Sequence, residues 1–493
     1  MSPFLGYEGG KVLYQLFFCG IALYKGYAAG GGFLFAPCVV GQDVFQGNAG
    51  EVHPARIGWQ LEAQDILLFG SRFHPANLHI SGQPAIRLPS ADQPANCLLP
   101  AGQSPDFCRF VKNLPMPDEG FLDKKLDERR GQNAFRRLRL PDGKTDFCSN
   151  DYLGIATNGL IGAAGGASGE QGLRHGSGGS RLLAGNYPLI EETDRDLAVF
   201  HQAEAALIFN SGYDANLGVL SSVPQRGDTV FYDALSHASI RDGLRLSLAD
   251  SFSFRHNDTA DLERKLQSLA NGDGTATGPG TGTVFVVTES VFSMDGDQAP
   301  LEEILGLCRQ YGAQLIIDEA HATGVVGPGG AGLVQEKGLA KEFFARIHTF
   351  GKAVGCHGAV VLGSQRLRDY LINFCRPFIY TTALPATSME AIRVAYELFP
   401  GLEEERQHLQ RLIGRFQQAS IRYQRLSSGT PIQVVIVPGN DAVKKLAEQI
   451  QSAGLDVRPI LYPTVPRGGE RLRIVLHSFN TIGELDRLVG QLA

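Results

Sequence analysis

An aspartate and a lysine each follow an apolar run that is typical of a buried strand. Residues 314–317 (QLII) lead into Asp318, and another strand-like run precedes Lys352, which lies among small residues. A lysine amine forms Schiff bases with aldehydes, and a carboxylate keeps a pyridinium nitrogen protonated as an electron sink. The order of these residues favours a pyridoxal 5′-phosphate (PLP) site over the alternative, a surface lysine and an aspartate that closes a turn.

Further candidates for cofactor contacts follow other strand-like runs. After residues 205–209, Ser211, Gly212 and Tyr213 open a helix whose first backbone N–H groups suit a phosphate. His237 follows the run 229–232 and is placed to stack on a bound ring, with a helix cap as the alternative. The glycine-rich residues 159–185 lack the Rossmann and P-loop patterns and predict a loop, either floppy or closing over a ligand.

The strands and helices that must position these residues alternate along the chain. Strands are expected at 205–209, 229–232, 252–254, 283–287, 314–317 and 359–362. Helices are expected at 121–138, 190–202, 301–311, 365–374 and 387–398. This alternation predicts an α/β protein with a mostly parallel sheet wrapped by helices. After Pro400 and Gly401, the order helix, strand, helix, strand, strand, helix predicts a small α+β domain.

Residues 1–115 differ in composition from the rest of the chain. They contain 14 of the 96 charged residues, four of the eight cysteines and the only tryptophan. Their apolar run, Val12 to Tyr24, is too short to span a bilayer. A targeting segment, an extra domain and sequence translated upstream of the true start are competing hypotheses, and we favour the third. The expected divisions are a poorly ordered or mis-assigned extension (1–115), a helix and strand segment (116–160), a large cofactor-binding domain (161–399) and a small domain (400–493).

Composition excludes several classes of function. The 493 residues include 43% hydrophobic residues and 60 glycines, which fits a soluble α/β enzyme. A net charge of −6 without a long basic run indicates no nucleic-acid partner. The eight cysteines contain no CxxC, so we expect no metal site and no redox motif, and reduced thiols are typical of a cytoplasmic protein. No membrane association is expected.

Taken together, the motifs from about Met116 to the C-terminus closely resemble the α-oxoamine synthases. These are fold-type I PLP enzymes that join an amino acid to an acyl-CoA with loss of CO2. The resemblance is carried in order by SNDYLG, GSGGSR, NSGYDAN, SHASI, ESVFSMDGD, DEAHATG, TFGKA, YTTALP and YPTVPRG. It implies a large domain with a mostly parallel seven-stranded sheet flanked by helices, plus a small C-terminal α+β domain.

The resemblance also indicates the substrates. The segments SHAS, TFGKAVGCHGAVV and IYTTALP favour the family member that condenses L-alanine with a pimeloyl thioester in biotin biosynthesis. Pimeloyl-CoA and pimeloyl-acyl carrier protein both remain open as the acyl donor. The alternatives are sibling activities that use glycine with acetyl-CoA or with succinyl-CoA. A non-catalytic family member is disfavoured because the expected catalytic residues are present.

Roles for individual residues are likewise implied by the resemblance. Lys352 would bind the cofactor aldehyde and act as the base, and Asp318 would pair with the pyridine nitrogen. His321 would contact the pyridine oxygen O3′, and His237 would stack on the ring. The four expected catalytic residues are Lys352, Asp318, His237 and His321.

The resemblance extends to the rest of the pocket. In addition to the catalytic four, the cofactor is expected to contact Gly212, Tyr213, Glu289, Ser293, Thr349 and, from a partner subunit, Thr381 or Thr382. The substrates are expected to contact Arg136, Asn150, His237, Thr464 and Arg473. Arg473 would hold the amino-acid carboxylate, with Asn150 beside it, while Arg136 and Thr464 would lie at the acyl end. A homodimer with a shared active site is expected.

Overall fold

The computed structural model describes the backbone of five strands within residues 4–48, together with residues 118–138, 140, 143–164, 175–272 and 282–493. It divides the chain into two units, Met1–Met116 and Pro117–Ala493. In the first unit, consecutive strands pair in an antiparallel sheet of β1 (Phe4–Glu8), β2 (Lys11–Phe18), β3 (Ile21–Ala29), β4 (Gly32–Phe35) and β5 (Phe45–Asn48). The hypotheses for residues 1–115 concern mostly positions outside the described residues and stay predictions.

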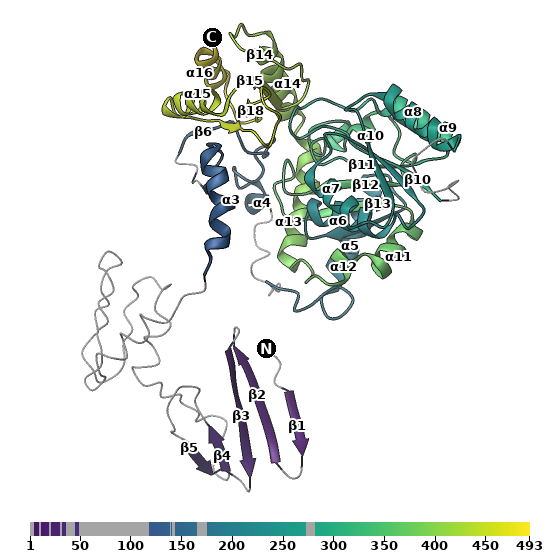
Figure 1. The fold of residues 1–493 in the computed structure, drawn as a ribbon, viewed down its shortest axis with the longest axis vertical. Helices are drawn as coiled ribbons and strands as arrows, with labels where there is room; N and C mark the ends of the chain where they lie inside the picture. The colour runs from purple at the N-terminus through teal and green to yellow at the C-terminus, as the bar shows by residue number, and fades with distance from the viewer. Residues whose placement is uncertain are drawn as a thin grey trace, which may run out of the picture. The chain divides into compact units, whose positions relative to one another are not determined.

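A seven-stranded sheet organises the second unit (Figure 1). Its strands, in spatial order, are β7 (Ala205–Phe209), β13 (Ala359–Gly363), β12 (Ala345–Thr349), β11 (Gln314–Asp318), β10 (Val284–Glu289), β8 (Thr229–Asp233) and β9 (Asp250–Phe254). Only β13 runs antiparallel to its neighbours in this sheet. The central strands β10, β11 and β12 are buried along almost their whole length, because helices cover both faces. The predicted fold class is therefore confirmed.

Alternate residues of one strand enter two different cores. In β10, Phe285 and Val287 belong to the core that includes Val219 of α6, whereas Val286 belongs to the core that includes Ile304 of α9. This alternation follows from the two-residue period of a strand and places one helical layer on each face. The helices flanking the sheet are α5 (Pro188–Phe200), α6 (Gly212–Ser222), α7 (Ala238–Leu246), α8 (Thr259–Ala270), α9 (Leu301–Tyr311), α11 (Gln365–Phe374), α12 (Arg376–Ile379) and α13 (Ala386–Leu398).

The N-terminal helix of the second unit is shorter than the sequence pattern predicts. Helix α3 spans Gly120–Gly131, whereas the pattern predicts 121–138. Gly131 has a low helix propensity, and the chain turns at Asn133, where φ is 49°. The N–H group of Ala134 closes this turn on the carbonyl oxygen of Arg129, at 2.8 Å. Arg136 therefore follows the helix instead of belonging to it.

A second, antiparallel sheet lies in the C-terminal part. Its strands, in spatial order, are β14 (Gln424–Arg425), β15 (Ile432–Ile436), β18 (Arg471–Val475) and β17 (Arg458–Ile460). The accompanying helices are α14 (Glu403–Gln418), α15 (Asn440–Ser452) and α16 (Ile482–Leu492). β16 (Leu455–Asp456) pairs in parallel with β6 (Thr145–Asp146). This pairing brings the segment after residue 145 to the C-terminal sheet, although the boundaries at 160 and 400 stay predictions.

Within the part of the chain that the structure describes, every helix is too short or too polar to cross a membrane.

Candidate active site

Polar side chains gather at the carboxyl ends of neighbouring strands of the large sheet. Asp318 is the last residue of β11, Glu289 the last of β10 and Thr349 the last of β12. In the register of the sheet, Glu289 is paired with Asp318. Because the three strands are parallel, these ends share one edge, which is where α/β proteins bind ligands.

The carboxylate of Asp318 is buried and held on both oxygens. Oδ2 accepts a hydrogen bond from Nδ2 of Asn216 at 2.6 Å, and Oδ1 accepts one from the backbone N–H of Ala320 at 2.8 Å. Asn216 lies on α6, which begins at the end of β7. Two elements therefore fix the orientation of this anion.

Lys352 lies in the turn after β12, where its amine meets a histidine. The Nζ atom of Lys352 is 2.7 Å from Nε2 of His321. Burial lowers the pKa of Lys352 to about 8, although the negative charge of Asp318 opposes this shift. At neutral pH about a tenth of a lysine with such a pKa is free amine, far more than for an ordinary lysine with a pKa of about 10.4, and a nucleophile or a base requires this form.

A chain of hydrogen bonds extends from this histidine to an arginine. Nδ1 of His321 is 2.6 Å from the hydroxyl group of Tyr152, which is 3.2 Å from Oδ1 of Asn150. Nη2 of Arg473 donates to the same Oδ1 at 2.9 Å, and its Nε donates to the carbonyl oxygen of Ser293 at 2.7 Å. Asn150 and Ser293 thus hold the guanidinium group on the side of the site formed by β18.

The pKa of His321 lies well below its usual value, because the ring is buried and because Lys352 and Arg473 carry positive charge nearby. The imidazole is therefore neutral, with a hydrogen on only one of its nitrogens. Its two nitrogens are both engaged, one with Lys352 and one with Tyr152.

His237 caps helix α7 beside this cluster. Its backbone N–H donates to Oε1 of Glu289 at 2.5 Å, and its Nδ1 is 2.7 Å from the hydroxyl group of Ser239. Burial lowers the pKa of His237, so the ring is neutral. Burial, followed by the charge of Asp318, raises the pKa of Glu289 to about 8, so this carboxyl group is largely protonated at neutral pH.

The start of α6 provides backbone N–H groups at the same edge. Ser211 caps the helix, since its Oγ accepts from the N–H of Asp214 at 3.1 Å, while the N–H groups of Gly212 and Tyr213 have no acceptor within the helix. A Cβ atom at Gly212 would lie 3.4 Å from Cβ of Thr349, so these two residues are in contact range. This arrangement is suited to a phosphate group.

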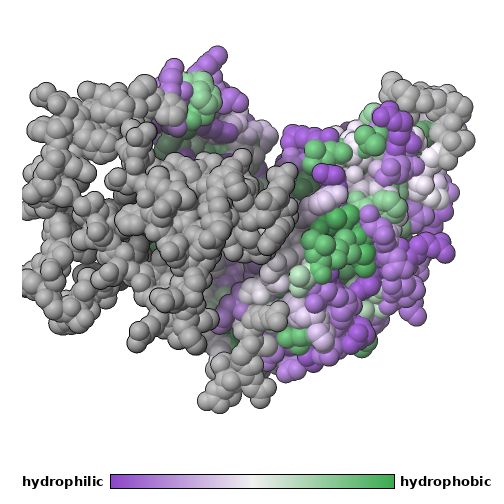
Figure 2. Space-filling model, turned by 90° about the horizontal axis from the view of Figure 1, so that it is seen from below, coloured by the Kyte–Doolittle hydropathy of each residue, from purple (hydrophilic) through white to green (hydrophobic). Residues whose placement is uncertain are grey.

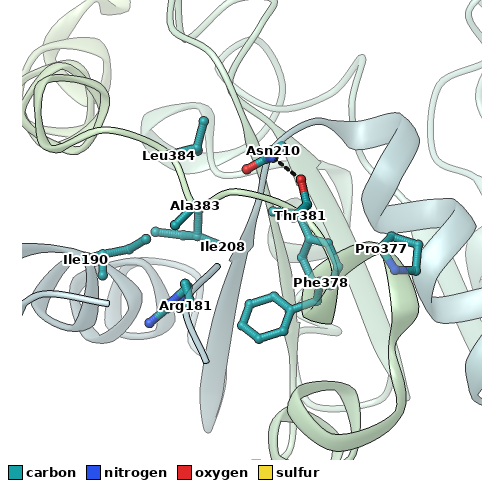
Figure 3. A pocket seen from close by; sticks show the side chains of 10 residues that line it. Arg181, Ile190, Ile208, Asn210, Pro377, Phe378, Thr381, Ala383 and Leu384 are labelled. Carbon is teal, nitrogen blue, oxygen red and sulfur yellow. Dashed lines mark hydrogen bonds between the residues drawn. The ribbon is translucent and has the colours of Figure 1, made fainter. Parts of the chain in front are cut away.

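Thr381 and Thr382 lie beside the residue that follows β7. Nδ2 of Asn210 donates to Oγ1 of Thr381 at 2.8 Å and to the carbonyl oxygen of Thr382 at 2.9 Å. Figure 3 shows Asn210 and Thr381 facing each other, with Arg181 lining the same pocket. The two threonines therefore neighbour the beginning of α6 within one chain.

Arg136 and Thr464 are both exposed and contact each other. Although 328 positions separate them, Nη2 of Arg136 donates to Oγ1 of Thr464 at 3.3 Å. The sequence-based assignment of both residues to one end of the site is consistent with this contact. Both side chains are exposed, in contrast to the buried group around Lys352.

Three residues of the cluster received no role from the sequence alone: Tyr152, Asn216 and Ser239. Asn216 follows Gly212 by four positions, so both lie on one face of α6, and this spacing was a usable signal. Tyr152 had a weaker signal, as a single aromatic residue within the polar turn 149–154. Among the described residues, no group of three or more His, Cys, Asp or Glu side chains is arranged to hold a metal ion.

Comparisons with known proteins agree with this geometry. Residues 142–492 match the family described as aminotransferase class I and II. The 8-amino-7-oxononanoate synthase of Emericella nidulans is 42% identical over 389 residues, and the match covers 76% of this chain and 94% of that protein.

Solved structures show the same fold. A serine palmitoyltransferase from S. paucimobilis with a bound PLP–myriocin aldimine has a TM-score of 0.66 and 27% identity, covering 76% of this chain and 96% of that one. The 8-amino-7-oxononanoate synthase from Francisella tularensis has a TM-score of 0.57 and 27% identity, covering 71% and 97%. The chain therefore belongs to the aminotransferase class I and II family and, within it, to the 8-amino-7-oxononanoate synthases.

Proposed function

We propose that the protein condenses L-alanine with a pimeloyl thioester to give 8-amino-7-oxononanoate, CO2 and the free thiol, as a step of biotin biosynthesis. Family membership supports the proposal. The observation that carries it is the buried chain of hydrogen bonds that links the amine of Lys352 to the guanidinium group of Arg473. A base and a carboxylate-binding group are thereby held at one site, as a reaction at the α-carbon of an amino acid requires.

Pyridoxal 5′-phosphate is the cofactor of this family, and the described residues fit it. The amine of Lys352 suits the aldehyde, and the buried anion of Asp318 suits the pyridine nitrogen. The N–H groups of Gly212 and Tyr213 suit the phosphate, since they begin a helix. When bound, PLP supplies an electron sink that stabilises negative charge at the α-carbon of an amino acid.

Lys352 is the proposed base that removes the α-proton. Its pKa of about 8 makes the free amine much more accessible near neutral pH than in an ordinary lysine. Arg473 is the proposed partner of the substrate carboxylate. Among the described residues, Ser293 and Asn150 accept from two of its N–H groups, and a guanidinium group has five. The remaining donors suit a carboxylate.

Arg136 is proposed to act at the acyl end of the site together with Thr464. Both side chains are exposed, so a long thioester can reach them from solvent. The guanidinium group of Arg136 suits a carboxylate or a phosphate, and both occur in pimeloyl thioester donors. The donor is therefore proposed to be pimeloyl-CoA or pimeloyl-acyl carrier protein.

We further propose a homodimer with a shared active site, in which Thr381 or Thr382 contacts the cofactor of the partner subunit. Hydrogen bonds join Ala383 to Gly179 (2.9 Å) and to Ser177 (2.9 Å), so residues 177–183 lie beside residues 380–384. These two segments expose large apolar side chains, namely Leu182, Leu183 and Tyr380. Figure 2 shows one face of the protein, on which hydrophobic (green) side chains gather within a largely hydrophilic (purple) surface. Apolar surface of this kind favours contact with a second copy.

A cytoplasmic location is proposed on the basis of the cysteines. The described part of the chain contains four of them, and all four are free thiols: Cys148, Cys308, Cys356 and Cys375. Free thiols are typical of reducing compartments. Separating cytosol from membranes and organelles in the native host, followed by immunoblotting, tests this location.

The test of the function is a comparison of substrates with purified protein and PLP. We expect the visible absorption of bound PLP to change on addition of L-alanine, and mass spectrometry to detect 8-amino-7-oxononanoate after addition of pimeloyl-CoA or its carrier-protein equivalent. A response to glycine instead of alanine, with product from acetyl-CoA or succinyl-CoA, would assign a sibling activity. Absence of PLP binding would refute the proposal.

A further inference from the structure

The hydroxyl group of Tyr152 lies behind the histidine that meets Lys352. It is 2.6 Å from Nδ1 of His321, while Nε2 of the same ring is 2.7 Å from Nζ of Lys352. The side chain of Tyr152 is fully buried, so water does not replace this contact. Tyr152 itself does not touch Lys352, and any influence on the amine must act through the imidazole.

The hydrogen positions around His321 are restricted by its partners. A protonated Lys352 has three donors and no acceptor, so Nε2 must then accept and the ring hydrogen must be on Nδ1. Nδ1–H donates to the oxygen of Tyr152, and the Tyr152 hydroxyl donates in turn to Oδ1 of Asn150 at 3.2 Å. The ring hydrogen of His321 and the hydroxyl hydrogen of Tyr152 each have an acceptor in this arrangement.

The opposite arrangement places the hydrogen of His321 on Nε2. The ring then donates to an acceptor in the pocket, and Nδ1 must accept from the Tyr152 hydroxyl. The hydroxyl group gives up its bond to Asn150, whose Oδ1 keeps the bond from Arg473 at 2.9 Å. A tyrosine hydroxyl satisfies both arrangements because it is a donor and an acceptor, whereas a phenylalanine would satisfy neither.

We propose that Tyr152 is a positioning residue that holds the ring of His321 and allows it to change tautomer, so that Nε2 accepts from Lys352 in one state and donates to the bound cofactor in the other. The Nε2–H group of His321 needs an oxygen that accepts its hydrogen bond, and O3′ of PLP is such an oxygen. The inference therefore rests on the proposed function. Since Asn150 also holds Arg473, the same change alters the hydrogen bonding of the proposed carboxylate-binding group.

The test compares the Tyr152→Phe variant with wild-type protein. Phenylalanine keeps the buried ring and removes only the hydroxyl group. We expect PLP to bind about tenfold more weakly in an absorbance titration, and we expect the pH midpoint of the bound-cofactor absorption to shift. Tyr370→Phe is the matched control, because the hydroxyl group of Tyr370 donates to the carbonyl oxygen of Ser222, at the far end of α6. The control should leave both quantities unchanged.

A double-variant cycle separates this role from a purely structural one. If Tyr152 acts through His321, Tyr152→Phe should have little further effect on PLP affinity in a His321→Asn background. Equal effects in both backgrounds would overturn the proposal, as would a Tyr152→Phe variant with wild-type affinity and pH midpoint.

The tautomer of His321 can also be measured on wild-type protein, so this test does not depend on whether the Tyr152→Phe variant folds. The 15N signals of labelled histidine distinguish the two tautomers, and the signal that disappears in His321→Asn identifies His321. We expect the hydrogen on Nδ1 without PLP near pH 7, and on Nε2 with PLP. The same tautomer in both states would overturn the proposal. These results depend on PLP binding alone, so a failure to form 8-amino-7-oxononanoate would count only against the proposed function.

Discussion

His256 is bound on both sides by carboxylates, and its removal should destabilise the protein in a pH-dependent manner. Its Nδ1 is 2.9 Å from Oδ1 of Asp233, and its Nε2 is 2.7 Å from Oδ2 of Asp297. Asp233 is the last residue of β8 and is fully buried, while Asp297 follows the turn that contains Ser293. The rings of Phe292 and His256 also meet edge to face, with 4.4 Å between the centroids. Loss of this histidine leaves two facing carboxylates without the cation between them.

The size of this destabilisation follows from the pKa of the His256 imidazole. Burial opposes protonation of His256, but the hydrogen bonds to Asp233 and Asp297 outweigh it and raise the pKa from 6.5 to about 10. Such a rise corresponds to at most about 5 kcal/mol of stability, since one pKa unit is about 1.4 kcal/mol. The ring is 24% exposed, so solvent screening should reduce this to about 2–3 kcal/mol. Because the folded pKa is raised, the contribution is complete below about pH 6.5 and is lost as the pH rises through about 10.

Urea denaturation of wild-type protein and the His256→Gln variant measures this contribution. Both proteins should be free of PLP and at one protomer concentration, because ligands and association change apparent stability. We expect the free energies of unfolding to differ by about 2–3 kcal/mol at pH 6.5 and by less than about 1 kcal/mol at pH 10. His357→Gln is the control, because His357 is an exposed histidine, and it should show no such dependence. A difference that is equal at both pH values would refute the reasoning.

Three further substitutions test other parts of the site. Lys352→Ala should abolish product formation while PLP still binds weakly, and a loss of less than about tenfold in rate would contradict its role as the base. Arg473→Lys should raise KM for L-alanine about 10- to 100-fold with a smaller effect on kcat, measured by steady-state kinetics, because a lysine cannot form the bidentate contact. Gly296→Ala should lower the free energy of unfolding by about 2–4 kcal/mol, since φ is 75° and the added Cβ would lie 2.3 Å from the carbonyl oxygen of Ile432. Gly306→Ala, in an open position of α9, is its control and should be neutral or slightly stabilising in the same urea assay.

Most of the large sheet could be predicted from local sequence. The helix predicted over 301–311 has the bounds observed for α9, because Gly312 takes a left-handed conformation with φ of 66° and ends it. Strands that are buried on both faces give continuous apolar runs, which made β7 and β11 recognisable. The pairing of β16 with β6 could not be predicted, because the partners lie far apart along the chain and two-residue strands have no periodicity. The antiparallel direction of β13 had a usable signal, because residues 350–358 are too short a connection for a parallel crossover from β12.

In the site, too, residues that follow a recognisable strand could be predicted, whereas contacts between distant residues could not. Asp318 and Lys352 could be found because each follows a recognisable strand, and strand ends meet at one edge of a parallel sheet. The contact of Tyr152 with His321 joins residues 169 positions apart, and that of Arg473 with Asn150 joins residues 323 positions apart. No pattern in the local sequence predicts contacts between residues that are so far apart along the chain. Arg473 was assigned through family resemblance and not through chemistry visible in its neighbours.

The turn that ends in Asp297 explains why these distant residues belong to one site. The carbonyl oxygen of Ser293 in this turn accepts from Arg473, and that of Gly296 accepts from Ser428 and Thr430, both at 2.8 Å, near the beginning of β15. The contacts of His256 with Asp233 and Asp297 hold the other end of the turn to β8. This short segment is therefore bonded to both the large sheet and the C-terminal sheet. A substitution that loosens this segment should weaken recognition of the amino-acid carboxylate before it affects Asp318, because Arg473 depends on the turn and Asp318 on α6.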